Sequence, residues 1–326
     1  MLEKIYLAPM EGVCDPPMRK VLTHYGHYDE CFSEFIRVTT EVLPYKTLLR
    51  EVPELQNESK TAYGCLCRVQ LLGDEPEPLA QTALRAVELG AKSIDLNFGC
   101  PSRFVHHGGA MLLKEPDLMH AIVSRVREVL DSSIFLSVKF RLGFLSASEL
   151  PDIVRAVAVP GVNELIIHAR TRKDLYKKEA LDWPAIAQVV DSDLALHIPV
   201  VANGDITSYE SSQQCLAQSR APRQMVGRAA LAVPNLPQVM QGQEPAMPLH
   251  QVLAVAMEFA QELQGRDYPE KALMDRLKQF LGYAHKYDQR LCEFFRVFCR
   301  SQSLVEAQQL LEKQQCIFAA HTEADA

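Results

Sequence analysis

Long hydrophobic runs are missing from this chain of 326 residues. No apolar stretch approaches the roughly 20 residues that a membrane-spanning helix needs, so we expect no membrane segment. The start of the chain lacks a basic segment followed by an apolar stretch and a small-residue cleavage site, which argues against secretion. Glycine and proline are few, at 15 and 19 residues, while 48% of the residues are hydrophobic and 23% are charged. This balance argues against collagenous, low-complexity and disordered chains and indicates a folded, cytoplasmic protein.

Paired cysteine spacings are missing as well. The chain has nine cysteines, an odd number, and no C-x-x-C pair of the kind that binds zinc. Cys65 and Cys67 are the nearest pair, and their alternation is typical of a strand with both thiols on one side, with a metal site as the alternative. We therefore expect reduced thiols and no bound metal.

The length of the chain predicts one large domain with a smaller appendage. Short β-branched and apolar runs recur along it, each bounded by turn residues and followed by an amphipathic stretch of helix length. Eight such runs alternating with helices predict an α/β fold, a (β/α)8 or TIM barrel, over residues 1–240. The predicted strands are 5–9, 32–38, 68–72, 93–97, 135–139, 164–168, 199–203 and 224–227.

Two of the helices in this barrel have recognisable ends. Leu79, Ala83 and Ala86 share one face of a helix that is predicted to begin at residue 78 and to end at Gly90 as its C-terminal cap. Asp117 is the predicted N-cap of the next helix.

The strand pattern stops after residue 240. Glycine and two prolines punctuate a predicted linker at 241–248. Apolar stripes with helical spacing then indicate a small C-terminal helical bundle at 249–318, followed by a loose tail at 319–326.

Polar side chains stand at the predicted C-terminal end of nearly every strand. In a (β/α)8 barrel this edge is the working face, so these residues are candidates for a site. Any one of them could be a satisfied polar group of the core, but their gathering on one rim favours a function. They are Met10 and Glu11, Arg37, Gln70, Asn97 and Cys100, Lys139 and Arg141, His168 and Arg170, Asn203, Gly204 and Asp205, and Gly227 and Arg228.

Gly204 and Gly227 follow the last two predicted strands, where backbone N–H groups usually bind a phosphate in this fold. Arg228 would supply the countercharge, although both glycines could instead only make tight turns. Lys139 has two interpretations, a Schiff-base lysine or a fixed cation beside a cofactor ring. Arg141 and other nearby bases would help to lower the pKa of Lys139, and the residues alone leave both interpretations open.

Cys100 lies in a sharply turned loop, since it follows Gly99 and precedes Pro101. A thiol on the rim of the barrel can serve as a nucleophile or as a general acid. We favour the acid because no Cys-His-Asn arrangement is evident. A half-buried thiol without a role is the alternative.

Seven segments of the chain, taken in order, resemble the tRNA-dihydrouridine synthase family. The most specific is the Asn-x-Gly-Cys-Pro element around Cys100. Segments 53–57, 181–186 and 276–283 are similar, within the family, to the bacterial C-type enzymes, which act on uridine 16 of the tRNA D-loop. The matching segments are 7–12, 69–73, 95–102, 137–143, 168–170, 201–205 and 226–228.

This resemblance implies an FMN enzyme. NADPH, with NADH as the alternative, would reduce the flavin, hydride would pass to C6 of a uracil, and Cys100 would protonate C5. Lys139 and His168 would stabilise the negative charge that reduction builds up on the flavin ring. The implied flavin-binding residues are Pro9, Met10, Glu11 and Gln70 at the ring, Lys139 and His168, and Asn203, Gly204, Asp205, Gly227 and Arg228 at the ribityl chain and phosphate.

The resemblance also implies tRNA as a partner, whose target base must leave its stack to reach a flavin at the barrel mouth. Residues 271–300 carry seven Lys or Arg against three Asp or Glu, although the whole chain has a net charge of −7. Such a run is usually a solvated face, but in this family it favours RNA binding by the helical domain of a monomer. The predicted RNA-contacting residues are Arg37, Asn97, Tyr176, Arg276, Lys278, Tyr283 and Arg296.

The chain departs from the family pattern just after Cys100. Arg103 stands where the family usually has a lysine, and the loop 104–109 looks about two residues shorter than usual. A guanidinium keeps the charge of a lysine but not its geometry.

Three alternatives to a tRNA uridine reductase belong to other functional classes. A flavin barrel could reduce a small pyrimidine or enone, and the basic helical appendage argues against it. An aldolase would use Lys139 as a Schiff base and would be colourless. A non-catalytic RNA-binding barrel would keep its whole function after Cys100→Ala.

Overall fold

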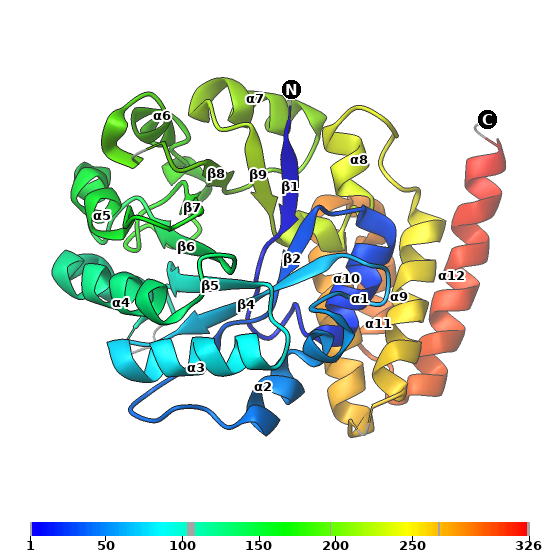
Figure 1. Ribbon diagram of the computed structural model, residues 1–326. Helices are drawn as coiled ribbons and strands as arrows, with labels where there is room; N and C mark the ends of the chain where they lie inside the picture. The colour runs from blue at the N-terminus through cyan, green and yellow to red at the C-terminus, as the bar shows by residue number, and fades with distance from the viewer. Residues whose placement is uncertain (1, 103–107, 196, 267, 325–326) are drawn as a thin grey trace.

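Parallel strands close into a barrel at the centre of the molecule (Figure 1). The computed structural model describes residues 2–102, 108–195, 197–266 and 268–324, with side chains to residue 320. The strands follow the order β2-β1-β9-β8-β7-β6-β5-β4-β3, and a further pairing of β2 with β4 closes the ring. Their bounds are β1 Lys4–Leu7, β2 Glu30–Phe32, β3 Ile36–Arg37, β4 Leu66–Leu72, β5 Ser93–Phe98, β6 Phe135–Arg141, β7 Glu164–His168, β8 Val200–Asn203 and β9 Arg223–Val226.

The predicted strand at 32–38 is divided into β2 and β3, which both pair with β4. The division occurs at Ser33, whose hydroxyl accepts a hydrogen bond from the backbone N–H of Gln70 at 2.9 Å. A side chain thus takes the place of a carbonyl in the ladder, and the chain bends before it pairs again at Ile36. The two short strands together form one stave, so the predicted (β/α)8 barrel is confirmed.

Helices surround the barrel between successive strands (Figure 1). Six of the eight carry proline in the first two positions, where its missing N–H costs no helical hydrogen bond. The predicted N-cap at Asp117 is wrong, because the helix begins at Pro116 and Asp117 lies in its first turn. These helices are α1 Pro16–Gly26, α2 Tyr45–Glu51, α3 Pro76–Glu88, α4 Pro116–Val129, α5 Leu150–Val157, α6 Pro184–Val190, α7 Tyr209–Ser219 and α8 Leu236–Met240.

A buried charged cluster fills the barrel interior near the N-terminal ends of the strands. Arg68 on β4 is fully buried and donates to Glu30 at 2.5 Å and to Glu164 at 2.7 Å. Tyr6 also donates to Glu164, at 2.8 Å. Because each charge has partners, the cluster can fill the barrel below the site without an unpaired buried ion.

Buried thiols lie on the other face of β2 and β4, near Arg19. Cys65 precedes β4 and Cys67 lies in it, and both thiols contact the thiol of Cys31 on β2. They therefore share one side, as their alternation predicts. Among the described residues, no group of three or more His, Cys, Asp or Glu side chains is placed to hold a metal ion.

Four helices follow the barrel after a segment, 241–248, that is neither helix nor strand. They are α9 Leu249–Gln264, α10 Glu270–Tyr287, α11 Cys292–Phe298 and α12 Leu304–Ala324. The loose tail expected at 319–326 is wrong for its first six residues, because α12 continues to Ala324 alongside α9 (Figure 1). The chain has neither glycine nor proline after residue 304 to end that helix earlier. No helix of the described chain is long and apolar enough to cross a membrane.

Candidate active site

A cavity of about 610 Å³ opens at the C-terminal ends of the barrel strands. Its wall includes Cys100 and all eleven residues predicted to bind the flavin. Of the seven predicted RNA-contacting residues, Asn97, Tyr176 and Tyr283 line it and the other four lie elsewhere. The cavity therefore joins residues that are up to 280 positions apart in the sequence into one site.

One side of the cavity is organised by a chain of buried polar side chains on β4, β5 and β6. Asp95 accepts from the Ser137 hydroxyl at 2.5 Å and from the Gln70 amide at 2.7 Å. The Gln70 oxygen accepts from Asn97 Nδ2 at 2.8 Å. Burial raises the pKa of Asp95 to about 6 despite these donors. The chain fixes which way both amides point, so Gln70 and Asn97 present defined atoms to the cavity.

Asn97 is also the support of the Cys100 loop. Its Oδ1 accepts from the backbone N–H groups of Gly99 and Cys100, both at 2.9 Å. Arg141 donates to the Gly99 carbonyl at 2.7 Å. The side-chain oxygen of Asn97 is thus engaged within the protein, where it positions the Cys100 loop. The predicted contact of Asn97 with the RNA base remains a prediction.

The Cys100 thiol is half-buried on this wall. Burial, with a smaller contribution from Glu11, raises its pKa above the ordinary value near 9, although Arg141 and Lys139 oppose the shift. At neutral pH the sulfur therefore carries its proton. This is the form that a general acid needs.

Lys139 on β6 and His168 at the end of β7 continue this wall, because β6 pairs with β5 and β7 pairs with β6. Burial, followed by repulsion from Arg141, lowers the pKa of Lys139 to about 8, which confirms the predicted direction. Burial and the surrounding cations hold the pKa of His168 well below its usual value. His168 is therefore neutral near pH 7, and its buried Nδ1 has no hydrogen-bond partner among the described residues. The wall offers one cation and one neutral ring that can donate to a ligand.

The far end of the cavity is formed by the turns after β8 and β9. Gly204 has φ +137°, which only glycine adopts without strain. A Cβ on Gly227 would lie 3.3 Å from the sulfur of Met10, so glycine keeps this wall open. Asp205 accepts from Arg228 at 2.7 Å and from Arg170 at 2.5 Å. Its carboxylate is thus engaged with two guanidinium groups and holds Arg228 in place.

Comparison with known proteins agrees with this geometry. The family model described as "Dihydrouridine synthase (Dus)" matches residues 6–321. The chain belongs to the dihydrouridine synthase family. It is 42% identical over 95% of its length to the tRNA-dihydrouridine(16) synthase of Escherichia coli strain K12, of which it covers 98%. The same-named protein of Yersinia pestis is 42% identical over 87% of the chain, with 90% of that protein covered.

The solved structures support the barrel alone. A 2-naphthoyl-CoA reductase aligns with 74% of this chain at a TM-score of 0.55 and 11% identity, and the chain spans 50% of it. The family membership makes the chain an oxidoreductase, as its sequence predicts.

Helix α10 of this synthase reaches over the cavity from the helical domain. Tyr283, Lys286 and Tyr287 line the cavity from its last two turns, beside the turn that carries Arg228. Of these, the sequence predicted only Tyr283. Lys286 and Tyr287 follow it at helical spacing, so continuing the same face by three and four residues would have found them. Arg141, predicted on the rim without an assigned role, also lines the cavity.

Four predicted RNA-contacting residues lie outside the cavity. Arg37 is exposed at the end of β3, and Arg296 is exposed on α11. Lys278 on α10 is half-buried and reaches the carbonyl of Ser301 at 3.4 Å. Arg276 instead points into the contact between α10 and the barrel. Arg103, where the chain departs from the family pattern, lies outside the described residues.

Proposed function

We propose that this enzyme reduces uridine 16 in the D-loop of tRNA to 5,6-dihydrouridine, with FMN as its bound flavin and NADPH as the reductant. The observation that carries the proposal is the meeting, in one cavity, of a protonated Cys100 thiol with Lys139 and His168 from the next two strands. The names of the relatives, tRNA-dihydrouridine(16) synthases, support the substrate and its position.

The residues that line the cavity suit the chemistry of FMN. The unpartnered Nδ1 of His168 is a buried polar atom that a flavin ring could satisfy. Gly204, Gly227 and Arg228 line the end of the cavity where the phosphate would bind, and Arg228 supplies a positive charge there. Pro9, Met10, Glu11 and Gln70 would border the ring, and Asn203 and Asp205 would border the ribityl chain.

Bound FMN would supply the hydride that C6 of the uracil accepts. The Cys100 thiol donates its proton to C5 and is left as a thiolate, which then recovers a proton from solvent. Lys139 would hold positive charge next to the ring, and His168 would donate a hydrogen bond there. Asn97 keeps the Cys100 loop in place through both of its backbone contacts.

The tRNA would lie across the cavity mouth, with the target base extruded from its stack. Tyr176 and Tyr283, which line the mouth, are suited to stack on bases. Arg37, Lys278 and Arg296 would contact phosphates. In this proposal the barrel, residues 1–240, does the chemistry, and the helical domain, residues 249–318, orients the RNA.

Mass-spectrometric mapping of dihydrouridine tests the proposal directly. Purified protein would be incubated with NADPH, FMN and tRNA that lacks the modification. We expect dihydrouridine at position 16 and nowhere else in the D-loop. Product at another position would overturn the position and keep the reaction. If no product forms although NADPH reduces the bound flavin, a small-molecule reductase replaces this proposal.

A further inference from the structure

The loop between β1 and α1 is held by two arginines that come from different parts of the molecule. Three successive carbonyls, those of Gly12, Val13 and Cys14, accept guanidinium hydrogen bonds. Arg19 on α1 binds the last of them, and Arg276 on α10 binds the first two. The same loop lines the cavity with Pro9, Met10, Glu11 and Val13.

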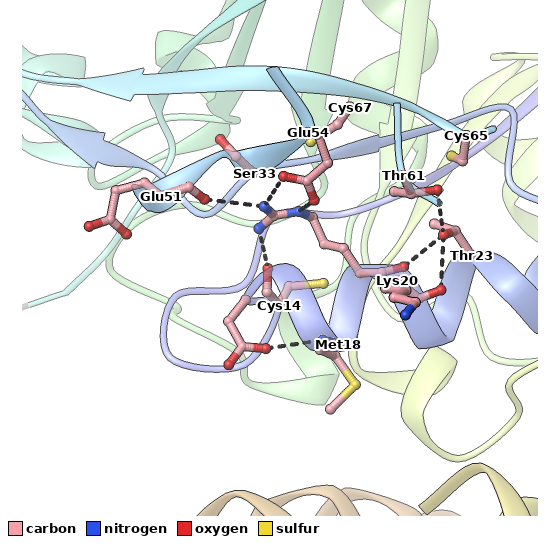
Figure 2. Close-up of polar contacts among 12 residues, drawn as sticks. Cys14, Met18, Lys20, Thr23, Ser33, Glu51, Glu54, Thr61, Cys65 and Cys67 are labelled. Atoms are coloured by element: carbon pink, nitrogen blue, oxygen red, sulfur yellow. Dashed lines mark hydrogen bonds and ion pairs between the residues drawn. The ribbon is translucent and has the colours of Figure 1, made fainter. Parts of the chain in front are cut away.

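Arg19 ties the loop to the barrel. Its side chain is fully buried and donates to the Cys14 carbonyl at 2.9 Å. A two-pronged contact with Glu54, at 2.8 Å for both bonds, and a bond to the Glu51 carbonyl at 3.2 Å fix the guanidinium (Figure 2). These partners of Arg19 all belong to the barrel, residues 1–240.

Arg276 ties the loop to the helical domain. Its Nη1 donates to the Gly12 carbonyl at 2.5 Å and to Gln279, and its Nη2 donates to the Val13 carbonyl at 2.7 Å and forms an ion pair with Asp15 at 2.8 Å. Both Nη atoms of the guanidinium therefore have partners within the protein. The Nε atom is buried without a partner. In this arrangement the guanidinium of Arg276 is directed at the β1–α1 loop, and not at solvent.

Arg276 also balances the negative charge of two carboxylates beside the loop. Asp15 also caps α1 through the N–H of Met18 at 3.1 Å, and Glu34 accepts from the N–H of Val13 at 3.1 Å. Without Arg276, these two carboxylates would face each other with less positive charge between them. The loop would then lose two carbonyl contacts and gain a repulsion.

We propose that Arg276 is a positioning residue of the active site: through the carbonyls of Gly12 and Val13, the helical domain sets the wall formed by Met10 and Glu11. This inference rests on the proposed function, because that wall is where the flavin ring would lie. It assigns Arg276 a role other than the phosphate contact predicted from the sequence.

The test compares Arg276→Ala with Lys278→Ala, two residues away on the same helix. Hydrogen exchange of the 9–15 segment, measured on the protein without added flavin, should be at least about tenfold faster in Arg276→Ala and unchanged in Lys278→Ala. FMN titration should show about tenfold weaker binding and a shifted flavin absorption band in Arg276→Ala only. A lysine cannot make the two-pronged contact of an arginine, so Arg276→Lys should restore little of the slow exchange or of the FMN affinity.

Asp15→Asn provides the second variant, since asparagine still caps α1 but removes the ion pair with Arg276. It should reproduce the faster exchange and the flavin shift without removing positive charge. The proposal is overturned if Arg276→Ala and Asp15→Asn leave exchange and flavin absorption unchanged while Arg276→Ala weakens tRNA binding as much as Lys278→Ala. If the wild-type protein binds no FMN, the proposed function fails, and the exchange comparison still decides the role of Arg276.

Discussion

Cys100 keeps its proton at neutral pH because it is half-buried, not because it lacks cations nearby. Lys139 and Arg141 both lower the pKa of this thiol, yet the desolvation of the thiolate outweighs them. A nucleophilic cysteine would need the opposite balance. The raised pKa therefore favours the acid over the nucleophile, which is also the preference drawn from the sequence.

Cys100→Ala should abolish proton delivery to C5 and leave the flavin site intact. We expect tRNA reduction to fall by about 10²- to 10⁴-fold, the usual contribution of a general acid. Reduction of bound FMN by NADPH should keep its rate, because Cys100 takes no part in that step. Single-turnover kinetics would separate the two half-reactions. Full tRNA reduction by this variant would rule out Cys100 as the acid.

Lys139 gives the site a pH dependence that can be measured without tRNA. Its pKa is lowered to about 8, so its charge is present below that pH and is lost above it. FMN, an anion, should therefore bind more weakly as pH rises through about 8. In Lys139→Met the affinity should be lower at pH 7 and should lack this decline. Equal pH profiles for both proteins would show that Lys139 does not face the flavin.

At the scale of helices and strands, the sequence predicted where the strands lie better than it predicted where a strand divides or a helix ends. Eight strands could be placed because each is a short β-branched run between turn residues. The division of the second strand could not, because it depends on Ser33 meeting the N–H of Gln70 across the sheet. The extension of α12 to Ala324 was also missed, although the sequence has no glycine or proline after residue 304 to end the helix earlier.

The Arg19–Glu54 ion pair joins α1 to the segment that follows α2 Tyr45–Glu51, and it is buried at both ends (Figure 2). Glu54→Gln would leave the Arg19 charge buried without its counterion. We expect the free energy of unfolding to fall by about 3–5 kcal/mol in urea titrations. The double variant Arg19→Met with Glu54→Leu should lose clearly less, because it removes both charges. A Glu54→Gln protein as stable as the wild type would show that water reaches this pair.

Across the whole molecule, the sequence located the site but not the contacts between its two parts. Residues at strand ends could be assigned to one rim because the barrel fold brings every strand end to the same face. Arg276 could not be placed, since its partners lie more than 260 positions earlier in the chain. Only the packing of α10 against the β1–α1 loop shows that this arginine faces inward, whereas Arg296 faces solvent.

Because Arg276 faces inward and Arg296 faces solvent, their substitutions should change the salt dependence of tRNA binding differently. Each phosphate contact releases counterions, which steepens the decline of log K with log salt by about 0.7 to 0.9. Lys278→Ala and Arg296→Ala should each flatten that slope by about this amount, because both residues lie outside the cavity on the basic helices.

Arg276→Ala should leave the slope unchanged even if it lowers the affinity, because its guanidinium is occupied by Gly12, Val13, Gln279 and Asp15. Binding isotherms of the flavin-loaded enzyme at several salt concentrations would measure all three variants together. A flattened slope in Arg276→Ala alone would mean that the arginine leaves the loop to meet a phosphate. Unchanged slopes in Lys278→Ala and Arg296→Ala would place the RNA on a different face of the helical domain.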